Sequence, residues 1–521
     1  MLTNIKFYKI FAVGAAAGLI LTSCGEKFLT AHATPQGEAG AAATESAILS
    51  YLTATYQPLL MDSYANYNYN HILLLSDLRS DDVYKGGGDA GDQSWMYHMS
   101  LFQIPASESP SGIWTLYYSA IARANNTLLA IENASGFDSD AAKRKLAGYK
   151  AEALFLRAYY LHHLWKLFGN IPFFTEPLDE PFMAKQKTAD EIYADIMTDI
   201  AAAEVAAADA GDEFPMYTNG TAKQARANLA ALYMLKARVV MYQKETSKYN
   251  EVAADMAKII KSSTYTLIDF DGLWTGADAN DFTKESIFET NQVSDGKRDW
   301  GSAWTGCGTN LPAYISPNEL NDPVFCGGWG FGPVHQATWD MYEDGDVRRE
   351  GSINKFADGT YGPRFQNTGL FQKKYAARTA LRSPIGTVDL NYPNNLIIFR
   401  YAETLLNYAE LVGVENATAA DGVTAQACLD EVRSRAGLGS IPVNAANIKA
   451  ERRKEFVGEG MRFWDLIRWG DAATVLTENE AAFQSVRTFD PAKDKYLPIP
   501  QSEMSRTQGT GEFELKQNNG Y

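Results

Sequence analysis

The sequence lacks the features that mark several large classes of protein. Only 4 of its 521 residues are cysteine, too few for a disulfide-dense scaffold, and no Cys/His spacing indicates a zinc site. The formal net charge is −16 and no long basic run occurs, so we expect no nucleic-acid partner. Past the N-terminus, no apolar run approaches the roughly 20 residues that a membrane-spanning helix needs.

The common catalytic signatures are also missing. The chain has no Gly-x-Ser-x-Gly nucleophile elbow, no Walker A loop and no HExxH zinc motif. The glycine-rich run 328–332 lacks the preceding strand and following helix that dinucleotide binding requires. The acidic residues near 89–92 and 269–271 do not have the spacing of a calcium-binding loop. We therefore expect no cofactor, no metal and no catalytic residue.

The chain does contain enough apolar material for a large core, because 46% of its residues are hydrophobic and 12% are aromatic. Apolar side chains recur every three or four positions over 143–168, and this helical period ends at Gly169-Asn170, just before Pro172. Similar helical segments are expected at 46–61, 113–132, 189–208, 221–243, 249–262, 395–412, 425–436 and 446–469. Helix pairs that bury a face only by stacking are the units of a helical solenoid. The sequence therefore predicts a mainly α fold built on a TPR-like helical scaffold.

Two long stretches interrupt the helical pattern. Residues 62–112 and roughly 264–394 are rich in Gly, Asn, Asp, Trp and Tyr and show little helical period. We expect loops with a few short strands there. Loops of this length in a folded protein are usually functional, so these two insertions are the expected place for a binding site.

The N-terminus has the composition of an export signal. Lys6 and Lys9 precede an apolar run over 10–21, which ends in small residues directly before Cys24. This combination resembles a bacterial lipoprotein signal, in which residues 1–23 are removed and Cys24 becomes the acylated N-terminus. Residues 24–44 are rich in Gly and Ala, which suits a tether. The alternative is an ordinary signal peptide with an incidental cysteine.

The C-terminal third carries the most specific signal. Residues 451–470 read ERRKEFVGEGMRFWDLIRWG and resemble the hallmark segment of the SusD/RagB family of Bacteroidetes outer-membrane lipoproteins. Further matches follow the family's order: AEALFLRAYY at 151–160 running to FGNIP at 168–172, FRYAE at 399–403, VRSRAG at 432–437, YLPIP at 496–500 and QNNGY at 517–521. The likeness covers nearly the whole chain after the signal.

The resemblance implies a specific cellular role. Residues 45–521 would form one SusD-like domain at the cell surface, held in the outer membrane by its lipid and seated as a lid on a SusC-like TonB-dependent transporter. Members of the family usually capture oligosaccharides, although some handle peptides. The hallmark segment itself is expected to be structural, with acids and bases at spacings of three and four forming ion pairs along one helix face.

Sugar binding needs flat aromatic faces that stack on pyranose C–H surfaces, together with polar groups for the hydroxyls. Most of the ten tryptophans lie in or beside the two loop-rich stretches. We expect ligand contacts from some of Trp95, Trp300, Trp304 and Trp329. The alternative for each is a place in the core, which is the simplest interpretation of the tryptophans in helices.

Resemblance to the family also makes Arg79, Asp81 and Asp82 candidates for polar ligand contacts, because members commonly place such contacts in this neighbourhood. The alternative is an Arg–Asp pair that braces the loop. Cys307 and Cys326 lie in a Gly- and Trp-rich region, and an exported protein permits a disulfide between them. Cys428 sits in a helical segment and is most simply a small buried side chain.

The predicted function is therefore a non-enzymatic surface lipoprotein that captures an oligosaccharide and passes it to its transporter. Three alternatives stay open at this point. A peptide could replace the sugar, as in RagB-like members. A surface glycoside hydrolase is not excluded, because paired carboxylates are common in an acidic chain. A pure TPR adaptor would bind only protein and would not need clustered loop tryptophans.

Overall fold

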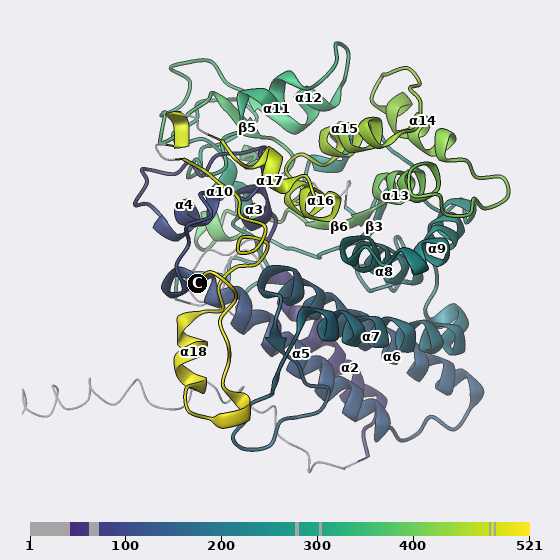
Figure 1. Ribbon diagram of the computed structural model, residues 1–521. Coiled ribbons are helices and arrows are strands. Elements are labelled where there is room, and N and C mark those ends of the chain that lie inside the picture. Colours follow the sequence, from purple (N-terminus) through teal and green to yellow (C-terminus); the bar gives the residue numbers. More distant parts are fainter. Residues whose placement is uncertain (1–41, 62–71, 277–280, 302–304, 479–480, 484–485) are drawn as a thin grey trace, which may run out of the picture.

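Figure 1 shows the computed structural model of the protein, which describes residues 42–61, 72–276, 281–301, 305–478, 481–483 and 486–521. The chain is mainly helical, as the periodicity predicts. The longer helices are α2 (Glu45–Tyr56), α5 (Ser111–Glu132), α6 (Asp140–Phe168), α7 (Ala189–Ala210), α8 (Leu229–Gln243), α9 (Tyr249–Lys261), α13 (Tyr401–Gly413), α14 (Ala425–Arg435), α15 (Ala445–Phe456) and α16 (Arg462–Trp469).

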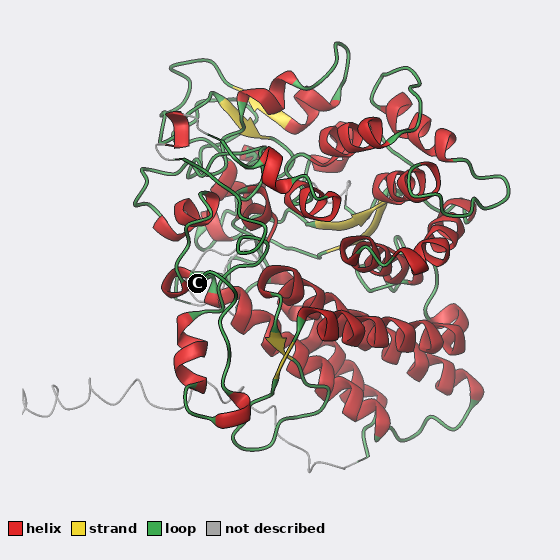
Figure 2. Cartoon of the chain, viewed as in Figure 1, coloured by secondary structure: helices red, strands yellow, loops and turns green. Residues whose placement is uncertain are grey.

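Shorter elements occupy the loop-rich stretches and the chain ends. The short helices are α3 (Ile72–Asp77), α4 (Ser94–Ser100), α10 (Leu311–Ile315), α11 (Gln336–Asp340), α12 (Arg348–Ser352), α17 (Ala472–Val475) and α18 (Gln501–Thr507). The strands are β1 (Ile171–Pro172), β2 (Gln186–Lys187), β3 (Ser286–Glu289), β4 (Ile353–Lys355), β5 (Leu370–Gln372) and β6 (Ile397–Arg400). Figure 2 shows how little of the chain these strands take up, and they form three antiparallel pairs: β1 with β2, β3 with β6 and β4 with β5.

The helices stack on one another in chain order. In the lower half of Figure 1, α6 packs between α5 and α7, and α2 packs against α5. Above them α8 packs on α9, α9 on α13 and α13 on α14. Successive helices that pack mainly on their neighbours are the arrangement of a helical-repeat scaffold, so the predicted TPR-like fold is confirmed. No helix among the described residues is long and apolar enough to cross a membrane.

Local signals in the sequence set the ends of the longest helices. The Ser139 hydroxyl accepts a hydrogen bond from the Ala142 N–H at 3.2 Å and begins α6, and Gly169 ends it with a positive φ of 67°. A Cβ on Gly169 would lie 2.7 Å from the Tyr496 ring, so this position requires glycine for space as well as for conformation. α7 begins with a capping box between Thr188 and Glu191.

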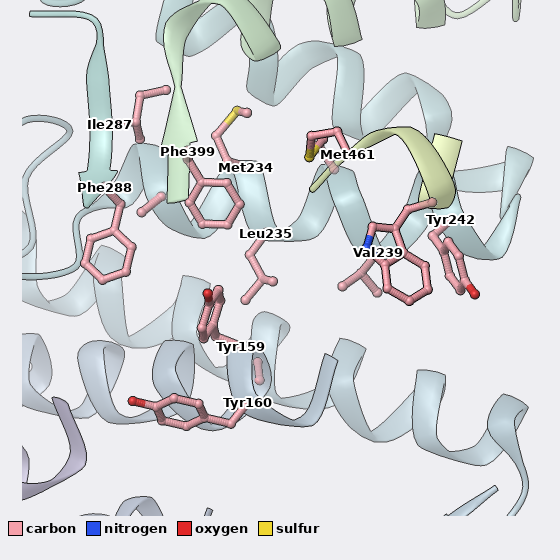
Figure 3. Packing of buried hydrophobic residues seen from close by; sticks show 14 of the residues in the cluster. Tyr159, Tyr160, Met234, Leu235, Val239, Tyr242, Ile287, Phe288, Phe399 and Met461 are labelled. Carbon is pink, nitrogen blue, oxygen red and sulfur yellow. The ribbon is translucent and has the colours of Figure 1, made fainter. Parts of the chain in front are cut away.

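One continuous core joins the helical scaffold to the loop-rich part. Figure 3 shows Tyr159 and Tyr160 of α6 beneath Leu235 and Val239 of α8, with Phe288 of β3 beside them. The Phe288 ring meets the Phe155 ring of α6 edge to face, with 5.4 Å between centroids. The loops are thus built directly onto rigid helices, which gives a binding site on them a fixed frame.

Three of the expected helices have different bounds in the structure. The segment 395–412 begins as strand β6, which pairs with β3, and only from Tyr401 is it helical. The expected helix 221–243 begins at Leu229, where the Asn228 side chain accepts from the Ala231 N–H at 2.8 Å. The expected helix 446–469 is broken into α15 and α16, because Gly458 and Gly460 between them have φ of 76° and 68°.

The expectation of ion pairs along one face of that helix was wrong in most of its pairings. The expected pairs of opposite charge were Glu459 with Arg462, Arg462 with Asp465, and Asp465 with Arg468. Only Asp465 and Arg468 form a salt bridge, at 2.8 Å. Glu455 and Glu459 turn instead to Arg400, at 2.6 Å and 2.8 Å, and Arg400 also reaches Glu285 at 2.9 Å. The break at the two glycines swings Glu459 toward β6, so the partners come from the loop-rich part rather than from the same helix.

This buried network joins segments that are far apart in the sequence. Arg348 and Arg435 also bond Glu455, so one carboxylate serves three guanidinium groups. Burial by itself would raise the pKa of Glu455, but Arg435, Arg400 and Arg348 together hold that pKa well below its usual value. The hallmark segment is therefore a structural junction, as the resemblance implied.

Candidate functional site

Two of the predicted tryptophans come together on the loop-rich part. The rings of Trp300 and Trp329 have centroids 5.7 Å apart and planes inclined by 33°. Trp300 is 40% exposed, one of the few large hydrophobic side chains on the surface, and Trp329 is half-buried. We call this pair of neighbouring rings the tryptophan platform.

Tight backbone packing places Trp329. Its N–H donates to the Ala313 carbonyl at 2.7 Å, and its ring meets the Tyr314 ring edge to face with 4.8 Å between centroids. Both of these residues belong to α10. Gly328 makes the approach feasible, because a Cβ there would lie 2.1 Å from the Ala313 carbonyl oxygen. Trp329, the less exposed ring of the platform, is therefore held rigidly.

A second pair of loops places Trp300. Asn391 accepts from the Arg298 N–H at 3.2 Å and donates to the Arg298 carbonyl at 2.8 Å, so the two loops are tied side by side. Nearby, Gly296 lies against the side chain of Ile385, which is 55% exposed. Trp300 is two residues beyond this tie, at the surface of the same loop.

Two charged side chains flank Trp329. The Asp389 carboxylate accepts a hydrogen bond from the indole N–H at 3.2 Å, and the Arg364 guanidinium donates to the Trp329 carbonyl at 3.1 Å. Asp389 is half-buried and Arg364 is exposed. Neither forms a salt bridge with any described residue. The sequence prediction missed both, since nothing in a single sequence links residues 35 and 60 positions away from Trp329 to its ring.

The structure does not bring all four predicted tryptophans together. Trp95 lies on α4, half-buried against the main core, and its indole N–H donates to the Gln93 side chain at 2.9 Å. No ring contact links Trp95 to the platform. Trp304 lies outside the described residues. Among the described candidates, only Trp300 and Trp329 therefore form a shared aromatic site.

The three polar candidates near the first loop face the interior. Arg79 is 1% exposed and donates to the Asp494 carbonyl at 2.7 Å, with its guanidinium over the Phe463 ring. Asp81 forms two hydrogen bonds with Arg462 at 2.7 Å and 3.0 Å, and Asp82 is bonded by Arg453 at 2.9 Å. These contacts hold the segment that follows α3 against α15, α16 and the chain near Asp494, and they leave little surface for a ligand.

The three cysteines among the described residues are free thiols, so the disulfide considered between Cys307 and Cys326 is not present in the structure. Different segments hold the two residues. The Cys307 carbonyl accepts from the Val293 N–H at 3.0 Å, whereas the Cys326 N–H donates to the Ala377 carbonyl at 2.9 Å. The Cys326 thiol lies 3.4 Å from the Tyr392 hydroxyl. Cys428 is buried in α14, as expected.

One group of acids among the described residues has metal-like spacing, but a lysine occupies its centre. Glu204, Glu251 and Asp255 surround the Lys236 ammonium, which lies 2.6 Å from Glu204 and from Glu251 and 2.5 Å from Asp255. Burial by itself would lower the pKa of Lys236, and hydrogen bonds to these acids raise it instead. The group is an ion-pair network that ties α7, α8 and α9 together.

Comparison with known proteins gives the same family over both ends of the chain. A model described as "SusD family" matches residues 349–521, and one described as "Starch-binding associating with outer membrane" matches residues 50–234. The surface glycan-binding protein A of Bacteroides fluxus is 57% identical, with a TM-score of 0.86 over 92% of this chain and 100% of that one. The protein belongs to the SusD/RagB family.

Two further SusD/RagB structures bear on the ligand. The surface glycan-binding protein A of Bacteroides thetaiotaomicron, solved in complex with laminarihexaose, is 34% identical, with a TM-score of 0.83 over 91% of this chain and 100% of that one. A laminarin-binding SusD-like protein is 29% identical, with a TM-score of 0.78 over 92% of this chain and 100% of that one. Among curated relatives, a SusD-like protein of Bacteroides ovatus is 24% identical. The matched region spans 87% of this chain and 81% of that protein.

Proposed function

We propose that this protein captures a neutral glucan of the laminarin type at the bacterial cell surface. The observation that carries the proposal is the tryptophan platform, whose two faces can stack on consecutive sugar rings. Asp389 and Arg364 beside it supply an acceptor and a donor for hydroxyl groups. Relatives that are 34% and 29% identical carry laminarihexaose or laminarin in their names, which supports the ligand class.

The shape of the platform supports a curved chain over a flat one. Laminarin is a β-1,3-linked glucan, and such chains follow a wide helix, whereas β-1,4-linked glucans form flat ribbons. An angle of 33° between the two ring planes suits consecutive sugars that turn relative to one another better than the sugars of a flat ribbon. A β-1,4-linked hexaose is therefore expected to cover only one of the two rings well.

A simple assay separates binding from hydrolysis. We expect the protein to retard in a native gel that contains laminarin, because the glucan is held at the platform. We expect no new reducing ends after prolonged incubation, since the proposed role is capture without cleavage. New reducing ends that appear in proportion to the protein concentration would favour the glycoside hydrolase instead. Retardation by a peptide mixture but not by laminarin would favour a peptide-binding role.

We further propose that residues 45–521 act as one lipid-anchored lid over a SusC-like transporter. The lipoprotein-like signal supports the anchor, and the tether 24–44 supports a lid that stays close to the membrane. About 20 extended residues reach at most roughly 70 Å, so the tether keeps the lid close to the membrane while letting it move.

Changing Cys24 to alanine is expected to release the protein from the membrane or to leave it as an uncleaved precursor. The acyl chains act by additive burial of about 0.8 kcal/mol per CH₂, so an unacylated chain has almost no membrane affinity. Fractionation of cells that express the Cys24→Ala variant, with N-terminal sequencing of the product, tests this. A variant that lacks residues 1–23 and still sediments with the membrane would refute lipid anchoring.

Gentle detergent extraction from the native organism is expected to recover this protein together with a barrel-sized partner. A lid that closes over a channel needs a stable contact with the barrel, so the two should elute together in size-exclusion chromatography. Mass spectrometry of that fraction identifies the partner. Recovery of the monomer alone, from membranes that still contain the transporter, would contradict the lid arrangement.

A further inference from the structure

The two charged groups beside Trp329 keep hydrogen-bonding atoms that no described residue uses. Arg400, by comparison, is buried and held by three carboxylates, those of Glu285, Glu455 and Glu459. Asp389 and Arg364, in contrast, each make one side-chain hydrogen bond, and both bonds go to Trp329. Among the described residues neither has an ionic partner.

Asp389 has one oxygen committed and one available. Its Oδ2 atom accepts from the Trp329 indole N–H at 3.2 Å, while no described residue donates to Oδ1. The residue lies on a short helical turn, Val388–Leu390, and is only half-buried, so Oδ1 can reach a ligand that lies on the indole. A sugar hydroxyl stacked over that ring is a suitable donor, and a hydrogen bond to a carboxylate is stronger than one to a neutral acceptor.

Arg364 supplies hydrogen-bond donors beside the backbone of Trp329. One of its N–H groups donates to the Trp329 carbonyl at 3.1 Å, and its aliphatic stem runs past Gly330, whose added Cβ would lie 3.5 Å from the Arg364 Cδ. The remaining guanidinium donors have no partner among the described residues. A planar group with several donors fits the oxygen atoms of neighbouring hydroxyls.

We propose that Asp389 and Arg364 determine how the glucan is oriented on the tryptophan platform, with Asp389 accepting from one sugar hydroxyl and Arg364 donating to others. Asp389 has a second task, because the same carboxylate fixes the ring on which the sugar stacks. The inference rests on the proposed function and adds to it the residues that hydrogen-bond the sugar hydroxyl groups. A flat aromatic face alone cannot distinguish glucose from its epimers, whereas a carboxylate and a guanidinium at fixed places can.

Calorimetric titration with laminarihexaose tests the proposal on variants of the full mature chain. Asp389→Asn keeps an oxygen for the indole N–H but replaces the other with an NH₂ group, so it removes the acceptor and leaves the ring in place. Arg364→Ala removes the donors. We expect each to weaken binding about tenfold, because each loses a hydrogen bond to a charged group. Arg144→Ala, at an exposed position on α6, is the matched control and should bind like the parent.

Tryptophan fluorescence of the unliganded variants separates ligand contact from structural damage. Asp389→Asn should keep the parent's emission spectrum and still lose affinity, whereas Asp389→Ala should change both. Selectivity supplies a second readout: the parent should prefer laminarihexaose to its galactose-containing counterpart, and both Asp389→Asn and Arg364→Ala should lose most of that preference.

Parental affinity and selectivity in both Asp389→Asn and Arg364→Ala would overturn the inference. If Trp329→Ala loses binding while Asp389→Asn and Arg364→Ala bind like the parent, the proposed function is supported and only the inference about the two charged residues is wrong. A parent protein that binds no laminarihexaose at all would instead remove the proposed function itself, so the two failures are distinguishable.

Discussion

Replacing both Trp300 and Trp329 with alanine is expected to lower the affinity for laminarihexaose about 100-fold. Covering about 60 Å² of each ring at about 25 cal/mol per Å² gives roughly 1.5 kcal/mol, or about tenfold for each ring. The two losses should add, because each ring stacks on its own sugar. Each single variant is therefore expected to lose about tenfold in titrations.

The matched control for these variants is Trp339→Ala. Trp339 is half-buried on α11 and lies near Arg349 and Lys355, with their charged groups 5.4 Å and 5.3 Å from its ring centroid. Its loss should affect stability somewhat and leave affinity unchanged. If the double platform variant folds with the parent's circular dichroism spectrum and binds as tightly as the parent, the binding site lies elsewhere.

Replacing Arg400 with alanine is expected to reduce the free energy of unfolding by about 3–5 kcal/mol. Arg400 is 1% exposed and bonds Glu285, Glu455 and Glu459, so its removal leaves buried carboxylates without sufficient compensating charge. The penalty comes from those stranded charges rather than from the lost attraction alone. Urea unfolding followed by circular dichroism measures the change.

The exposed pair Arg506 and Glu503 supplies the control for Arg400. These residues are three apart on α18, bond at 2.6 Å, and the Arg506 side chain is 37% exposed. Solvent screens such a pair, so Arg506→Ala should change stability by less than about 1 kcal/mol. Equal effects of Arg400→Ala and Arg506→Ala would show that the buried network does not hold the loop-rich part to the hallmark segment.

The helical scaffold was predictable because its signals are local. The apolar side chains over 143–168 recur at each turn of the helix, and the stop at Gly169 lies directly at its end. Neighbouring helices then pack because they follow one another in the chain. Strand β6 was assigned to a helix because its short apolar run, 396–399, directly precedes a true helix. A run of that length does not reveal its own period, and pairing with β3, more than 100 residues away, decided its conformation.

The candidate site was predictable only in part. Composition pointed to loop tryptophans, and two of those named, Trp300 and Trp329, do lie together at the surface. Their partners could not be found in the same way. Asp389 contacts Trp329 across 60 positions of the chain, and Asn391, two residues further on, ties the same loop to the one that carries Trp300. The predicted ion pairs of Glu455 and Glu459 were wrong for the same reason, because their actual partner, Arg400, lies more than 50 positions away in the sequence.

The central claim is that the tryptophan platform of this chain binds a curved, neutral glucan. Its most direct test is isothermal titration of the mature protein with laminarihexaose and, under the same conditions, with cellohexaose. We predict one saturable site for laminarihexaose and at least tenfold weaker binding of cellohexaose, because the flat chain covers one ring instead of two. Equal affinity for both hexaoses, or no heat with laminarihexaose, would contradict the account.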